Sequence, residues 1–189
     1  MSNNYSMQQE AILAAKAKIG DILTYEWDGS SYDTTSGVSR VVDTANGAAD
    51  LSRVGTSLQR KGHIAGDYRR HLYATETNAS AINAGGGMNA FNNADVNLTT
   101  SGGGENAGTL DYVYTLTLSP SIKFVSDTAV YDIANTSLNG IAFNPTAVGT
   151  RTNIKAVTVT VTGAEQTISL SAFSSNIGAN PQLPSRPYR

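Results

Sequence analysis

The chain has 189 residues, enough for one large domain with a core of its own, and it contains no cysteine. It therefore has neither disulfides nor thiolate metal ligands, which excludes the disulfide-dense secreted classes. Charged residues make up 15% of the chain, against about 25% in ordinary soluble domains, and Gly, Ser, Thr and Asn take their place. A net charge of −2 argues against nucleic acid or acidic membranes as partners.

The first expected element is a helix over residues 6–19, which begins at a capping-box pair and ends where Gly20 supplies a C-cap. Its apolar face carries Ile12 and Ile19, but it is weakly amphipathic, so it must gain stability by docking. Two interpretations remain open: a helix on the edge of its own domain, or an arm over residues 1–20 that packs on a neighbouring subunit. In the second case Ile12 and Ile19 are interface residues.

Residues 21–74 are expected to alternate between strands and one helix. Residues 21–27 read as a strand that ends at the turn signal Asp28-Gly29, and residues 32–42 as its return strand. Apolar residues at helical spacing predict a helix over residues 50–61, and residues 68–74 predict a further strand.

Residues 77–110 differ in character, because they are rich in Gly and Asn and contain no Lys or Arg. They include two glycine triplets, at 85–87 and 102–104. A tract of this length with few core residues predicts a long surface excursion. Because loop-closure entropy depends weakly on length, replacing residues 84–104 with a short Gly-Ser link is expected to cost little stability.

The second half of the chain returns to short β segments. Residues 111–118 alternate until Ser119-Pro120 ends the strand, and shorter strands are expected at 122–125, 129–133 and 141–143. The strongest pattern follows, with period-two alternation over residues 154–162 and 167–171 separated by a turn. This predicts a β-hairpin whose buried face carries Val157, Val159, Val161, Ile168 and Leu170.

Strands at intervals of 8 to 15 residues predict a mainly β fold, an antiparallel sandwich or jelly-roll-like domain over residues 21–179. The Pro-rich residues 180–189 are expected to form an extended C-terminal arm. Leu183 and Tyr188 are the apolar side chains by which this arm would contact a partner.

No motif for catalysis, phosphate binding or cofactor binding occurs in the chain. His63 and His71 are the only histidines, and both lie among cationic residues that oppose a metal site. Four carboxylates in the 21–33 segment are typical of a polar face, although the turn at Asp28 is a possible weak Ca²⁺ site. We therefore expect no enzymatic activity, no catalytic residue, no metal ligand, no cofactor and no small-molecule substrate.

The missing active site, the β-rich second half and the arm-like ends favour a structural protein that self-assembles. Its most plausible setting is a bacteriophage virion, as a capsid coat, decoration or tail protein, with copies of itself or other virion proteins as partners. Met1 without a following secretory signal predicts synthesis in the host cytoplasm. The alternative is an extracellular carbohydrate-binding or adhesin-type β module, for which the candidate exposed aromatics are Tyr25, Trp27, Tyr112 and Tyr114.

Overall fold

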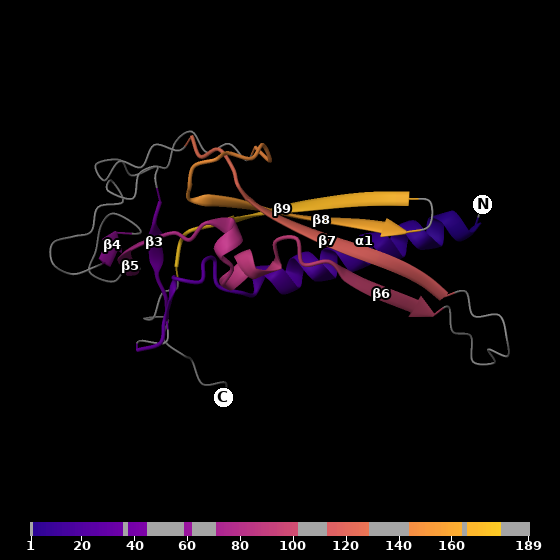
Figure 1. Cartoon of the computed structure of the whole chain (residues 1–189), viewed down its shortest axis with the longest axis horizontal. Helices are drawn as coiled ribbons and strands as arrows, with labels where there is room; N and C mark the ends of the chain where they lie inside the picture. The colour runs from indigo at the N-terminus through magenta and orange to yellow at the C-terminus, as the bar shows by residue number, and fades with distance from the viewer. Residues whose placement is uncertain are drawn as a thin grey trace, which may run out of the picture.

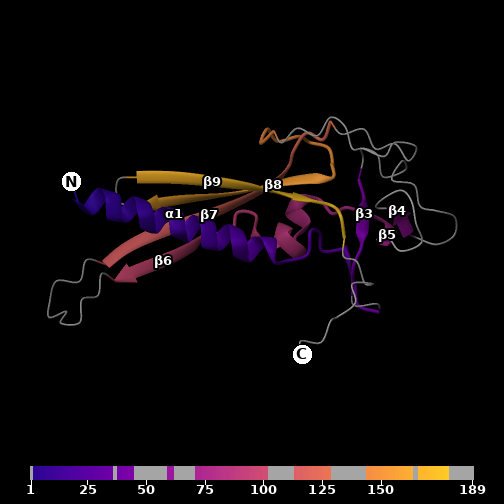
Figure 2. The same cartoon turned by 180° about the vertical axis from the view of Figure 1, so that it is seen from behind.

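One long helix lies along one face of an antiparallel sheet (Figures 1 and 2). The structure is a computed structural model that describes residues 2–35, 38–44, 59–61, 71–101, 113–128, 144–163 and 166–178. The helix is α1 (Ser2–Leu23), and the strands lie side by side in the order β6 (Val96–Ser101), β7 (Val113–Phe124), β8 (Ile154–Gly163) and β9 (Gln166–Ser175). The prediction of a mainly β chain with an N-terminal helix is confirmed.

The predicted hairpin is confirmed as β8 and β9, which pair antiparallel from Ile154–Ser175 to Gly163–Gln166. Val157, Val159 and Val161 are completely buried on one face of this sheet, while Ile168 and Leu170 are half-buried beside them. The opposite face carries paired hydroxyl side chains: Thr158 bonds Ser171 at 2.8 Å, and Thr160 bonds Ser169 at 2.9 Å. The alternation of the sequence therefore separates an apolar face from a hydroxyl face.

Helix α1 covers the apolar face of the sheet. Its buried side consists of Ala11, Ala14, Ala15, Ile19 and Ile22, so small side chains face the sheet in the middle of the helix. At about 1.5 Å per residue, the 22-residue helix is about 33 Å long and runs most of the length of the sheet. Packing against the sheet supplies the stability that its weak amphipathicity does not.

The helix is longer at both ends than its sequence pattern predicts, and it begins at Ser2, before the capping-box residue expected to start it. It continues through Gly20 to Leu23, so residues 21–23 form its last turn, and the strand expected over residues 21–27 is absent. A glycine inside a helix costs about 1 kcal/mol relative to alanine. The complete burial of Ile22 contributes about 1.5–3 kcal/mol and outweighs that cost.

The expected sandwich or jelly roll is not confirmed. In the described part of the chain, the layer that packs on the apolar face of the sheet is α1. The core joins the helix to β7 and β8 through the buried residues Leu116, Leu118, Ile122, Phe124, Val157, Val159 and Val161.

Strand β7 runs through Pro120, where the sequence predicted that a strand would end. The neighbouring strand β6 stops at Val96, opposite Leu118, so Pro120 lies where β7 has lost its partner on that side. Proline is tolerated in a strand where no ladder hydrogen bond requires its missing N–H. Pro120 still pairs in register with Val159 of β8, and its carbonyl accepts a hydrogen bond from the backbone N–H of Asn93 at 2.9 Å.

The small strands β1 to β5 lie at the opposite end of the molecule from the N-terminus (Figure 1). Strands β1 (Tyr32–Asp33) and β2 (Val38–Ser39) form an antiparallel pair. In the second sheet, β5 (His71–Asn78) pairs in parallel with β3 (Val41–Asp43) and antiparallel with β4 (Gln59–Lys61).

Two groups of expected elements fall partly or wholly outside the described residues. Of the helix expected over 50–61, residues 59–61 form β4 and residues 50–58 lie outside. The short strands expected at 129–133 and 141–143 also lie outside the described residues.

Asn176, just after β9, connects the large sheet to β3. Its side-chain amide accepts from the Val42 N–H at 3.1 Å and donates to the Val42 carbonyl at 2.7 Å, as a strand backbone would. The same amide donates to Asn153 Oδ1 at 3.0 Å, and Thr44 donates to that oxygen at 3.0 Å. Because all four residues are buried, these bonds replace the hydration that the polar groups lose on folding.

The Gly/Asn-rich segment contributes regular structure to the domain. It contains two short 3₁₀ helices, η1 (Ile82–Ala84) and η2 (Gly87–Phe91), followed by strand β6. Met88 of η2 is completely buried, and β6 pairs with β7 along its whole length. In the described range 77–101 the segment therefore adds an edge strand to the sheet and buries Ala79, Met88 and Asn89, while most of its other side chains lie at the surface.

Candidate functional site

A buried lysine lies at the beginning of β8, on the same face as the valines. Lys155 has no exposed surface, and its ammonium donates to the Trp27 carbonyl at 2.6 Å, to Asn89 Oδ1 at 2.8 Å and to Asp28 Oδ2 at 3.3 Å. These three acceptors match the three donors of an ammonium group. They come from the turn after α1 and from η2, so the lysine connects three separate parts of the chain.

Asp28 is the carboxylate partner of this lysine and is itself completely buried. Its Oδ1 accepts from the Ser30 N–H at 3.0 Å and from the Ser30 hydroxyl at 2.7 Å, which forms a local Asx turn. Its Oδ2 accepts from the Ser80 N–H at 3.0 Å and from Asn89 Nδ2 at 3.2 Å, in addition to Lys155. Both oxygens are therefore fully hydrogen-bonded.

The glycine triplet at residues 85–87 brings Asn89 into the cluster. Gly86 and Gly87 have φ values of 85° and 54°, which side-chain-bearing residues rarely adopt. A Cβ on Gly86 would also lie 2.9 Å from the Cα of Gly29. This close approach lets the Met88 N–H donate to the Glu26 carbonyl at 2.8 Å and places the next side chain, Asn89, between Lys155 and Asp28.

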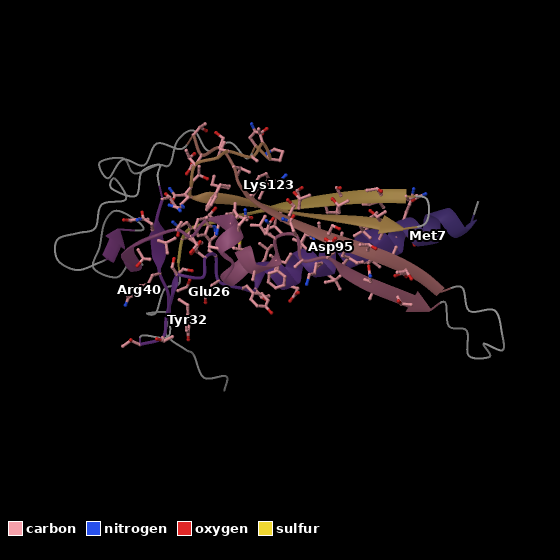
Figure 3. All side chains as sticks on the ribbon, viewed as in Figure 1. Met7, Glu26, Tyr32, Arg40, Asp95 and Lys123 are labelled. Carbon is pink, nitrogen blue, oxygen red and sulfur yellow. The ribbon has the colours of Figure 1, made fainter. Side chains whose placement is uncertain are left out.

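Two aromatic rings surround the ammonium. Nζ of Lys155 lies 3.8 Å from the centroid of the Trp27 ring and 5.1 Å from that of Phe124. The Trp27 indole is fixed by donating its Nε1–H to the Ser174 carbonyl at 3.2 Å. Trp27 directly follows Glu26, which is labelled in Figure 3 and lies in the turn between the end of α1 and the cluster. The rings attract the cation and exclude water from it.

The surroundings change the pKa values of both charged groups. Burial lowers the pKa of Lys155 to about 8, because a desolvated ammonium is disfavoured and the Asp28 carboxylate recovers only part of the loss. Burial alone would raise the pKa of Asp28, but the hydrogen bonds from Ser30 and the charge of Lys155 outweigh it and hold the pKa below its ordinary value. At pH 7 the cluster is mainly an ion pair, because the lowered pKa of Lys155 still lies above 7.

Acid should destabilise the folded chain through Asp28. The pKa of Asp28 in the folded chain lies below its unfolded value of about 3.9, so the ionised carboxylate stabilises the fold. This stabilisation is fully present above the unfolded pKa and is lost as the pH falls through the folded pKa. Urea melts between about pH 6 and pH 2 should therefore show a smaller loss of stability for Asp28→Asn than for the unmodified chain. The control Asp95→Asn removes an exposed carboxylate, and an equally reduced loss in that variant would contradict the assignment to Asp28.

The residues predicted as contact sites do not come together. Ile12 is exposed on the outer surface of α1, whereas Ile19 is buried in the core against the sheet. Leu183 and Tyr188 of the expected C-terminal arm lie outside the described residues, and so does His63. Of the aromatics considered for ligand binding, Tyr25 is exposed and Trp27 is buried.

The lysine cluster was missed from sequence, although two signals pointed to it. Lys155 occupies a position on the apolar face of the best-predicted strand, in phase with Val157 and Val159, where a charged residue needs a buried partner. The glycine triplet indicated a close backbone approach. Neither signal identifies Asp28 or Asn89 as the partner, because these residues are distant in sequence.

Neither a metal-site geometry nor a similarity to a known protein assigns a function to the Lys155 cluster. Among the residues that the structure describes, no three His, Cys, Asp or Glu side chains lie together as a metal site requires. In the same part of the chain, no helix is both long enough and apolar enough to cross a membrane. No protein-family model matches the chain, and no curated protein or solved structure is significantly similar to it.

Proposed function

We propose that this chain is a structural subunit that assembles with copies of itself through the outer surface of α1. The observation that supports this proposal is a group of exposed apolar side chains on that surface. Leu13 is 59% exposed, Ile12 43% and Leu23 40%, although the same helix buries five other apolar residues against its own sheet. Neighbouring exposed apolar side chains of this size on one helix are candidates for contact with a partner.

The spacing of these residues suits a second helix. Leu13, Ala17 and Gly20 follow one another at intervals of four and three, and all are exposed. Nothing lies within 4 Å of a Cβ built on Gly20, so a neighbouring backbone has room to approach there. Ile12 and Leu23 flank this row on one side. A helix of another copy laid along the row would cover its apolar side chains.

The other face of the molecule has the opposite character. Over much of their length the outward positions of β7, β8 and β9 carry hydroxyl side chains, and only near the start of β8 do Ile154 and Ala156 form a small buried cluster on this face: the hydroxyl positions are Thr115, Thr117, Ser119, Ser121, Thr158, Thr160, Thr162, Thr167, Ser169 and Ser171. Such a surface is well hydrated and offers little apolar area for a stable contact. The outer surface of α1 is mixed, because Gln9, Glu10, Lys16 and Asp21 are exposed beside the apolar side chains, but it offers more apolar area for a contact than the hydroxyl part of the sheet does.

The kind of assembly follows from the symmetry of the contact. Two copies that meet helix to helix form a closed dimer, and a ring, a shell or a filament forms where a second, different surface of the subunit also makes a contact. A bacteriophage capsid, decoration or tail protein remains our proposed setting, with virion proteins as partners, and the proposal includes no enzymatic role. The carbohydrate-binding alternative is less favoured, because Trp27 is buried against Lys155 and unable to stack on a sugar.

The proposal is tested by the oligomeric state of the purified chain. Size-exclusion chromatography with light scattering should detect species larger than a monomer, and Leu13→Glu should shift the population to monomer without lowering the melting temperature, because the side chain touches solvent in the subunit. Thr167→Glu on the hydroxyl face is the matched control and should leave assembly unchanged. A monomer at every concentration, in the unmodified chain, contradicts the proposal.

A further inference from the structure

We propose that Lys155 and Asn89 form an intramolecular isopeptide bond, in which the lysine amine displaces ammonia from the asparagine carboxamide and Asp28 carries the proton between them. The bond would tie β8 to η2 covalently inside the core. The inference rests on the geometry of the buried cluster and is independent of how the subunit assembles.

The reacting groups are already in contact. Nζ of Lys155 lies 2.8 Å from Asn89 Oδ1. Because a C=O bond is about 1.23 Å long, Nζ lies within about 4 Å of the carboxamide carbon. A reactive geometry needs about 3–3.5 Å between the reacting atoms, so a movement of about 1 Å or less brings the amine to the carbon. The orientation of the amide is fixed at both ends, because Oδ1 accepts from Lys155 while Nδ2 donates to Asp28.

Asp28 is placed to move the proton that this reaction requires. Its Oδ2 lies 3.3 Å from the nucleophile, Nζ of Lys155, and 3.2 Å from the leaving group, Nδ2 of Asn89. One oxygen can therefore accept a proton from the lysine ammonium and return a proton to the departing nitrogen. A carboxylate within hydrogen-bond reach of both atoms satisfies the geometric requirement for general acid–base catalysis.

The step balances without a further reactant. The C–N bond of the carboxamide breaks as a new bond forms between Nζ of Lys155 and Cγ of Asn89. A primary ammonium and a carboxamide become a secondary amide and an ammonium ion, and Asp28 returns to its carboxylate form. No oxidant, reductant or cofactor is needed.

The surroundings favour the reaction in two ways. Lys155, Asp28 and Asn89 are all buried, so water neither competes with the amine as nucleophile nor reaches the new amide. Desolvation also lowers the pKa of Lys155 to about 8, which makes the neutral, nucleophilic amine accessible near neutral pH. The Trp27 and Phe124 rings hold Nζ in place while it loses its charge.

The bond would close a large loop. Asn89 and Lys155 are 66 residues apart, and the link would connect a short 3₁₀ helix to a central strand. A covalent link of this length restricts the unfolded chain, as a disulfide does, in a protein that has no cysteine.

Mass spectrometry of the full chain tests the proposal directly. The intact protein should be lighter than its sequence by one ammonia, about 17 Da, which is the leaving group of the displacement. Trypsin, which cuts after Lys and Arg, should release residues 71–123 joined to residues 152–189, with no cut at Lys155. The same digest of an unlinked chain cuts after Lys155 and gives residues 71–123, 152–155 and 156–189 as separate peptides.

Matched variants identify the roles of the three residues. Lys155→Arg keeps a cation but lacks a nucleophilic amine, and Asn89→Ala lacks the carboxamide, so both should show the full sequence mass. Asp28→Asn should slow bond formation by roughly 100-fold or more, followed as the mass change after refolding. A folded chain of the unaltered sequence that retains its full mass after prolonged incubation at about pH 8–9, where the neutral amine is more populated than at pH 7, overturns the proposal. A loss of about 18 Da with Asp28 joined to Lys155 also overturns it, because water would then be the leaving group.

Discussion

Val159→Asp is expected to lower the free energy of unfolding by more than about 4 kcal/mol, because it buries a carboxylate that has no partner. Val159 is completely buried under α1 and pairs in register with Pro120 on one side and Leu170 on the other. The nearest cation on its strand is Lys155, whose three donors already have acceptors. Urea melts of the purified variant, or its loss from the soluble fraction, provide the measurement.

Thr160→Asp is the matched control, one residue further along the same strand. Thr160 lies on the hydroxyl face, where it is partly exposed and bonds Ser169 at 2.9 Å. Losing that bond in contact with water should cost about 1 kcal/mol. Equal damage from both substitutions would mean that the hydroxyl face is covered as well, by a partner or by another part of the chain. A harmless Val159→Asp would contradict the register of the sheet.

The features predicted correctly from sequence are those determined by neighbouring residues. The β8–β9 hairpin follows from period-two alternation over adjacent segments, and the structure confirms its buried face. The capping box and Gly20 correctly predicted a helix near the N-terminus, but both of its ends were misplaced. Whether it stops at Gly20 or continues depends on Ile22 meeting the sheet, and no local signal reports that contact.

The features that could not be predicted depend on contacts between distant parts of the chain. Lys155 and Asp28 are 127 residues apart, so the alternation that places Lys155 on the buried face of its strand does not identify Asp28 as its partner. Strand β6 has polar residues at most positions and becomes a strand because β7 offers a free edge beside it. Pro120 in β7 predicted the end of a strand, because the sequence does not show where β6 stops. A strand tolerates proline only where no neighbouring strand needs its missing N–H.

Replacing residues 84–104 with a short Gly-Ser link is expected to cost more than about 4 kcal/mol, in contrast to the small cost predicted from loop length alone. The substitution removes Met88, whose complete burial contributes about 2–5 kcal/mol by comparison with other core truncations. It removes β6, which pairs with β7 from Val96–Leu118 to Ser101–Val113. It also removes Asn89 and leaves the buried ammonium of Lys155 one acceptor short, a further cost of about 1–3 kcal/mol.

Point variants within this segment separate its contributions. Met88→Ala should cost about 2–5 kcal/mol in urea melts while leaving the Lys155 cluster intact. Its control is Ala90→Ser, two residues along η2 at an exposed position, which should stay within about 0.5 kcal/mol of the unmodified chain. If Met88→Ala is as mild as Ala90→Ser, η2 is not packed into the core. The burial of Met88 would then be excluded as the cause of any instability in the loop replacement, and the lost acceptor for Lys155 and the lost strand β6 would have to account for it.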